Sequence, residues 1–144
     1  MSTHYPNAAC RHVLDSKTLL DEERWDGCAY IAGYAIECSL KAVISHPECP
    51  SDVDLVAIGH DLSTLAHRLD QMASSRKSGR KRNVCAGTLT ALRGSLKSQS
   101  PTWGPSMRYE GQNPLWEAKA RAWWSLANRC FQNLAQNLVT EAAT

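Results

Sequence analysis

Two short segments hold the side chains whose types and spacing could do chemistry: GYAIECSLK at residues 33–41 and GHDL at residues 59–62. Glu37 and Lys41 are four residues apart with the acid first, which is the favourable order for an ion pair on a helix. His60 carries an imidazole, which exchanges a proton near neutral pH. Together these groups could bind an anionic ligand or transfer a proton.

Two interpretations of Glu37 are open. As a solvent-exposed pair with Lys41 it would contribute only about 0.3–0.5 kcal/mol. Alternatively it is a partly buried, hydrogen-bonded carboxylate beside Tyr34, whose ring combines an apolar body with a polar tip. Tyr30 and Tyr34, with Gly33 allowing close backbone approach, would also suit a helix–helix contact between subunits. We favour a structural or dimer-contact role over catalysis, with Glu37 mainly organising local hydrogen bonds.

Two roles are also open for His60, which lies just before a predicted helix N-terminus. It could face a phosphate or act in catalysis, because helix N-termini attract anions. Alternatively Gly59 forms the turn, Asp61 caps the helix, and His60 hydrogen-bonds to a carboxylate such as Glu37. We favour this second role. We expect His67, farther along the same helix, to be exposed.

The segment RKSGRKR at residues 76–82 is the best candidate for contact with nucleic acid. Five of its seven residues are basic, namely Arg76, Lys77, Arg80, Lys81 and Arg82. They could hold a phosphate backbone without reading its sequence. They could equally form a solvated loop after a helix C-terminus, where cations are favourable.

A second loop is predicted at residues 98–114, which hold three prolines and two glycines. Its Trp103, Arg108 and Tyr109 could stack on a base and hold a phosphate. They could also anchor the loop to the helices, which we favour because an irregular loop needs anchors.

Length, composition and net charge restrict the class of protein. A chain of 144 residues with 43% hydrophobic residues can bury the core of one domain. A net charge of +2 is far from that of a dedicated nucleic-acid binder. We find no apolar segment long enough to span a membrane and no signal peptide, so we expect a cytoplasmic protein without membrane contact. The six cysteines form no CxxC pair, and no Gly-rich phosphate loop or HExxH is present, so neither a metal nor a cofactor is expected.

Helical periodicity predicts an all-α, antiparallel up-and-down bundle of four to five helices in a single domain, residues 1–144. The first expected helix begins after Pro6 with Asn7 as its N-cap, and the second runs over about 25–45. A short third helix is capped by Asp61, a fourth spans about 83–98, and the last runs from Pro114 to about 141. A polar segment at 21–27 separates the first two, and Gly27 could mark the connection.

Apolar residues at spacings of three and four predict the inner face of each helix. These are Ala9, Val13, Leu14 and Leu20; then Ala29, Ala32, Ile36, Leu40, Val43 and Ile44; then Leu62, Leu65, Ala66, Leu69 and Met72; then Cys85, Leu89, Leu92 and Leu96; and last Trp116, Ala120, Trp123, Ala127, Cys130, Leu134 and Leu138. Trp124 lies off the last face and is expected at a subunit interface.

The stretch from about residue 11 to residue 41, followed by GHDLSTLA at 59–66, resembles a HEPN domain (higher eukaryotes and prokaryotes nucleotide-binding). Trp25 stands where the family pattern has an aromatic residue directly after an arginine, which here is Arg24. The other matching residues are Tyr30, Gly33, Tyr34, Glu37, Cys38, Leu40 and Lys41 in the first motif, and Gly59, His60, Asp61 and Leu62 in the second. Trp103 with Arg108 and Tyr109 is similar to a loop signature before the last helix.

The resemblance implies an all-helical bundle that is usually a homodimer. Many HEPN proteins are RNases, often toxins, and many occur beside a minimal nucleotidyltransferase. The RNases carry an arginine, four to six residues, and a histidine near the start of the last helix, and two such motifs form one site at the dimer interface. Here no histidine has an arginine at that spacing before it, and the last predicted helix has no histidine.

The sequence therefore predicts a dimeric binding module without RNase activity, whose partner is a nucleotide, RNA or a nucleotidyltransferase-type protein. The expected ligand-binding residues are Tyr34, Glu37, Lys41, His60, Arg108 and Tyr109. One alternative is a metal-independent endoribonuclease that uses His60, Glu37 and Arg108. The other is a structural dimerisation module that buries Tyr30, Tyr34 and Trp124 between subunits.

Overall fold

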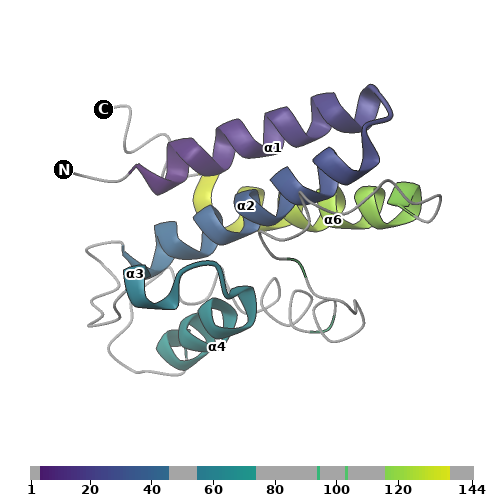
Figure 1. Cartoon of the computed structure of the whole chain (residues 1–144). Helices are drawn as coiled ribbons and strands as arrows, with labels where there is room; N and C mark the ends of the chain where they lie inside the picture. The colour runs from purple at the N-terminus through teal and green to yellow at the C-terminus, as the bar shows by residue number, and fades with distance from the viewer. Residues whose placement is uncertain (1–3, 46–54, 74–93, 95–102, 104–115, 137–144) are drawn as a thin grey trace.

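The computed structural model describes residues 4–45, 55–73, 94, 103 and 116–136, and within them it contains helices and no strand. Four helices pack together, as Figure 1 shows: α1 (Tyr5–Asp21), α2 (Trp25–Ile44), α4 (Leu62–Ala73) and α6 (Trp116–Cys130). A single turn, α3 (Leu55–Ile58), precedes α4, and a π-helical turn (Phe131–Ala135) continues α6. The predicted all-α class is confirmed.

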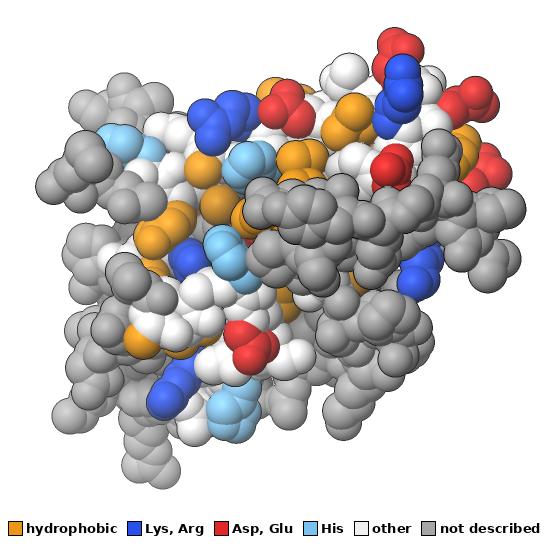
Figure 2. Space-filling view, viewed as in Figure 1, with side chains coloured by type: hydrophobic (Ala, Val, Ile, Leu, Met, Phe, Trp, Pro, Cys, Tyr) orange, Lys and Arg blue, Asp and Glu red, His pale blue; other side chains and the backbone are white. Residues whose placement is uncertain are grey.

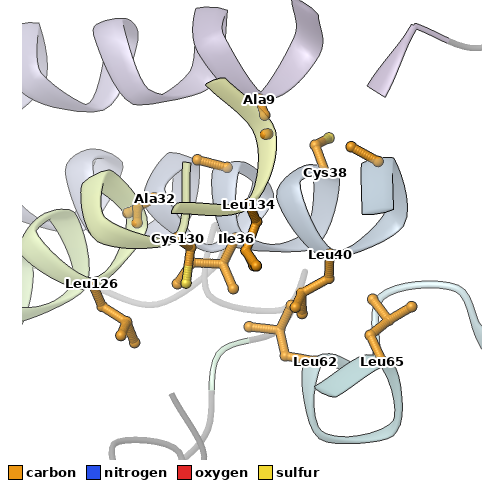
Figure 3. Close-up of a cluster of buried hydrophobic side chains, with 14 of the residues drawn as sticks. Ala9, Ala32, Ile36, Cys38, Leu40, Leu62, Leu65, Leu126, Cys130 and Leu134 are labelled. Carbon is orange, nitrogen blue, oxygen red and sulfur yellow. The ribbon is translucent and has the colours of Figure 1, made fainter. Parts of the chain in front are cut away.

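Helix α2 lies at the centre of the packing, in contact with α1, α4, α6 and the π-helical turn. Fourteen of its twenty residues are buried, because neighbours cover it on several sides rather than on one. In Figure 3, Leu40 lies close to Leu62 and Leu65 of α4. The predicted inner face of α2 is confirmed, since all six of its apolar residues are buried.

Helix α2 corrects the expectation that no apolar segment could span a membrane. By length and composition alone, Trp25–Ile44 is long and apolar enough to do so. Its burial against α1, α4 and α6 accounts for the same composition, because a core helix enclosed by other helices is apolar all round.

The connection between α1 and α2 is a tight turn centred on Glu23. The Arg24 N–H donates to the Leu19 carbonyl (2.8 Å), and the Glu23 N–H donates to that of Leu20 (3.1 Å). These two bonds close a helix C-terminus in which Glu23 adopts the left-handed conformation, with φ 60°. Gly27 is not the connection, since it lies inside the first turn of α2.

The start of α1 differs from the prediction. The helix begins at Tyr5 with Pro6 in its first turn, so Asn7 is not the N-cap. Proline is accepted there because the first helical N–H groups have no partner within the helix. Leu14, predicted to face inward, is 62% exposed, whereas Ser16 is buried and donates from Oγ to the Cys28 carbonyl (2.9 Å).

The other helices agree with the prediction where they are described. The Asp61 carboxylate accepts a hydrogen bond from the Thr64 N–H (3.1 Å), which confirms the predicted cap of α4. The last helix changes after Cys130 from an α-helix to a π-helical turn, which the sequence pattern did not predict. The buried residues of α6 and this turn include Ala120, Trp123, Ala127, Cys130 and Leu134, as expected. The expected helix at 83–98 lies outside the described residues apart from Gly94, as do Leu138 and the side chains of Met72 and Trp116.

Candidate functional site

The candidate site is a cluster of polar and aromatic side chains from four parts of the chain. We call it the His60 cluster, and it comprises His12 of α1, Tyr30, Tyr34, Glu37 and Lys41 of α2, His60 from the turn before α4, and Trp103. Figure 2 shows one face of the molecule on which histidine side chains lie among hydrophobic and basic ones.

Glu37 is the centre of the hydrogen bonding. Its residue is 5% exposed, and its two carboxylate oxygens have different partners. Oε1 lies 2.6 Å from His60 Nδ1, and Oε2 accepts from the Lys41 ammonium at 3.2 Å. A buried carboxylate needs such partners to remain charged. The buried, hydrogen-bonded interpretation of Glu37 is confirmed, and the solvent-exposed ion pair is wrong.

His60 is held by Glu37 while remaining half exposed, with 49% of its side chain accessible. Because the Glu37 carboxylate already accepts from an ammonium group, Nδ1 of His60 must carry the proton in their contact. The other ring nitrogen, Nε2, is then the one left for a ligand. A carboxylate that fixes the tautomer and orientation of an imidazole is the arrangement found behind both binding and catalytic histidines.

The turn that carries His60 is built as predicted, but it does not form a phosphate site at the helix N-terminus. Gly59 adopts a left-handed φ of 63°, and its N–H donates to the Leu55 carbonyl (3.1 Å). The Asp61 carboxylate already occupies the N-terminus of α4. An anion placed there would meet that negative charge, so a ligand is better accommodated by His60 itself.

Lys41 is the counter-ion of Glu37 in the interior. Its side chain is only 9% exposed, and its ammonium lies 5.8 Å from the centre of the Tyr5 ring, within the range of a cation–π contact. Both contacts direct its charge toward the protein. The expected role of Lys41 in binding a ligand would therefore act through Glu37.

Tyr34 joins the aromatic members of the cluster. Its ring meets Trp103 edge to face, with centroids 4.9 Å apart, and meets His60 in the same way at 5.5 Å. Its hydroxyl lies 3.0 Å from that of Tyr30, one turn earlier in α2. His12 contacts the Tyr34 ring from α1, with centroids 5.8 Å apart. Such edge-to-face pairs each add about 0.5–1.5 kcal/mol beyond the buried area.

Trp103 anchors its segment to α2, as we expected. The indole is 6% exposed, and Nε1 donates to the Tyr30 carbonyl (2.8 Å). Its ring occupies the space left by the missing side chain of Gly33. A second subunit therefore does not use Gly33 for close approach, and the buried indole offers no face on which a base could stack.

His12 is the member of the cluster that the sequence analysis missed. Its Nδ1 is buried and has no hydrogen-bond partner among the described residues. Burial and then the Arg11 charge lower the pKa of His12, whereas Asp15 and Glu37 act to raise it. The signal was its position next to Val13 on the inner side of α1, in a helix whose other inner residues are small or apolar.

Several expected site residues are not part of this geometry. Arg108, Tyr109 and the basic segment 76–82 lie outside the described residues, and His67 is exposed as predicted. Trp124 is half buried and packs in its own chain against Leu20, Cys28 and Ala120.

Two buried cysteines are poorly suited to chemistry. Burial raises the pKa of Cys38 to about 11 and that of Cys130 to about 12, so both are protonated at neutral pH and poor nucleophiles. Among the described residues no group of three or more His, Cys, Asp or Glu could hold a metal ion.

Comparison of the chain with protein-family models, curated proteins and solved structures finds no match. The function is therefore argued from the His60 cluster.

Proposed function

We propose that this chain is a HEPN-like binding module that holds a nucleotide or RNA at the His60 cluster and does not cleave RNA. One observation carries the proposal: a half-exposed imidazole is fixed by a buried carboxylate, 2.6 Å away, whose charge is balanced by a buried lysine. Three polar groups are thus held in one orientation before any ligand arrives. Preorganisation of this kind strengthens binding because less side-chain freedom is lost in the complex.

The chemistry of the cluster supports a phosphorylated, ring-containing ligand. His60 can donate to a phosphate through Nε2 when its ring is protonated. Tyr30 and Tyr34 are partly exposed beside it and present aromatic edges to a base or ribose. The absence of the arginine–histidine motif argues against the RNase activity of the resembling family.

The homodimer and the nucleotidyltransferase-type partner follow from the resemblance and belong to the same proposal. The cytoplasmic location, which was expected because the sequence shows no signal peptide, is part of it as well. A purely structural dimerisation module is less well supported. Tyr30 and Tyr34 pack against Trp103 of their own chain, and a polar cluster with a half-exposed His60 remains beside them.

An endoribonuclease is the second candidate, and the Glu37–His60 contact favours it specifically. With Nδ1–H donating to Glu37, a neutral His60 has a lone pair on Nε2 that could accept the proton of a ribose 2′-hydroxyl. The carboxylate would orient the base, as in other base–orienter pairs. This candidate needs no metal but does need a group that protonates the leaving oxygen.

One RNA gel distinguishes these functions. The purified full-length protein is incubated with a mixed RNA pool at low and moderate salt without added metal, and RNA is separated on native and denaturing gels. His60→Ala removes the imidazole of the cluster, and His67→Ala is the matched control because it removes an exposed histidine from α4. A salt-sensitive shift that only His60→Ala weakens, without shortened RNA, is the expected result.

Other results would change the assignment. Shortened RNA that disappears with His60→Ala would establish the endoribonuclease. A shift that His60→Ala leaves unchanged would move the binding site to another surface, with the segment 76–82 as the next candidate. Intact and unshifted RNA, together with no binding of free nucleotide, would contradict the proposal and favour a protein partner.

A further inference from the structure

We propose that His12 and His60 bind one phosphate group together, as a pair of imidazole donors from two different parts of the chain. The inference rests on the proposed function and adds to it a second ligand-binding residue and the chemical group that is recognised. His12, which reaches the cluster from α1, is not among the residues that match the resembling motifs.

The two imidazoles share their neighbours. Both rings contact the ring of Tyr34, with centroid distances of 5.8 Å for His12 and 5.5 Å for His60. Glu37 hydrogen-bonds to His60, and its charge also acts to raise the pKa of His12. The two imidazoles thus pack around one phenol ring close to one carboxylate, and these shared neighbours point to a common ligand.

His12 is suited to donate while neutral. Its Nδ1 is buried without a partner among the described residues, and an unpaired N–H is tolerated less often than an unpaired acceptor. The ring proton therefore belongs on Nε2. Burial also lowers the pKa of His12, so the ring is neutral at pH 7 and offers a single N–H.

His60 supplies the second donor, and its charge when protonated. Its Nδ1–H is committed to Glu37, so protonation places the new N–H on Nε2. The charge of Glu37 is already balanced by Lys41, so the pair leaves the positive charge of His60 available to an anion. A protonated His60 thus offers phosphate both an N–H donor and a positive charge.

The surroundings favour an anion over a metal ion. Both oxygens of Glu37 already have hydrogen-bond partners, His60 and Lys41, and the Lys41 ammonium beside the carboxylate repels a cation. Arg11, beside His12, adds an exposed guanidinium that opposes a cation and attracts phosphate. Asp15 is the nearby charge that opposes an anion, and it lies exposed on α1.

The test follows both imidazoles directly in the full-length protein. Protein labelled with 15N-histidine is titrated with inorganic phosphate, adenosine monophosphate, adenosine and a short single-stranded RNA without terminal phosphates. The ring resonances are assigned by replacing each of the five histidines with Gln in turn, so that the His12 signal is also identified by elimination. We expect inorganic phosphate and adenosine monophosphate to shift the signals of His12 and His60 with one common dissociation constant, and to leave His67 unmoved.

The variants measure how much each ring contributes. Loss of one donor to a charged ligand should weaken binding of adenosine monophosphate about tenfold for either single variant. Because both donors hold the same group, the double variant should lose less than the product of the two single effects. His67→Gln should bind like the wild type. The wild-type titration decides the question even if His12→Gln fails to fold.

The possible results of these titrations distinguish failure of this inference from failure of the proposed function. Shifts of His60 alone, or different dissociation constants for the two rings, would overturn the shared site while leaving nucleotide binding at His60. Adenosine binding as tightly as its monophosphate would overturn recognition of phosphate. No response of either ring to any of the four probes would overturn both proposals. Comparison of the RNA with the monophosphate shows whether a diester or a terminal phosphate is the natural source.

Discussion

The indole of Trp103 lies where a side chain at position 33 would be. A β-carbon added to Gly33 would overlap Trp103 atoms Nε1, Cε2 and Cδ2, and the same Nε1 donates to the Tyr30 carbonyl one turn earlier in α2. The glycine thus provides a notch, and the tryptophan fills it. Because Trp103 also contacts Tyr34 edge to face, this contact supports the aromatic side of the His60 cluster.

Gly33→Ala should therefore destabilise the protein although alanine is the better helix former. Forcing a methyl group into a filled site typically costs about 1–3 kcal/mol, more than the roughly 1 kcal/mol gained in helix propensity. The free energy of unfolding from urea titrations, followed by circular dichroism, measures the change. Gly27→Ala is the matched control within α2, since a β-carbon there meets only Leu19 at an ordinary 3.5 Å. Equal effects of the two substitutions would contradict the close packing of Trp103 against Gly33.

Glu37→Gln should destabilise strongly, because it leaves the buried Lys41 ammonium without a compensating charge. Breaking a buried ion pair by removing one partner costs about 3–5 kcal/mol. Glu117→Gln provides the control, since Glu117 and Arg121 form a pair of the same spacing in α6, at 3.2 Å, with both side chains more than half exposed. There the loss should stay below about 1 kcal/mol. If Glu37→Gln kept its stability but lost ligand binding, Glu37 would act on the ligand rather than as an organiser.

Local patterns in the sequence predicted much of this architecture. The apolar spacing in α2 identified its inner face, and the GHDL segment predicted both the cap by Asp61 and the contact of His60 with a carboxylate. These features depend on residues close in sequence or on a single pairing of unlike charges. Such relations are visible in residue types and spacing.

What the sequence did not predict depends on contacts between distant segments. His12 joins the cluster because α1 packs on α2, and its inner position in α1 indicates burial without indicating which residues of α2 it meets. Gly33 was assigned to a subunit contact, whereas its partner is Trp103, seventy residues later. The connection after α1 was expected within 21–27, but the turn was assigned to Gly27, because a glutamate, Glu23, occupies the left-handed position where glycine is usual.

Glu23→Gly should stabilise the turn between α1 and α2. A non-glycine residue in the left-handed region has an energetic penalty of about 1–2 kcal/mol, which glycine avoids at the expense of extra freedom in the unfolded chain. We expect a net gain of roughly 0.5–1 kcal/mol in the free energy of unfolding. Glu22→Gly is the control, because Glu22 has a negative φ of −87° and gains nothing from glycine. A loss of stability in Glu23→Gly would show that its side chain matters more than its backbone.

The stability of the protein should fall on acidification partly through His12. The pKa of His12 is lowered in the folded state, mainly by burial, from the value of 6.5 expected in the unfolded chain. Between these two pKa values the unfolded chain binds more protons, so the free energy of unfolding decreases as the pH drops below about 6.5. One such group contributes at most about 1.4 kcal/mol per pH unit within that window. Urea titrations at closely spaced pH values from 7.5 to 4.5 measure the slope, and His12→Gln should reduce it by up to that amount while His67→Gln serves as the control for losing a histidine. An unchanged slope in His12→Gln would show that burial of the ring against Tyr34 does not hold it neutral.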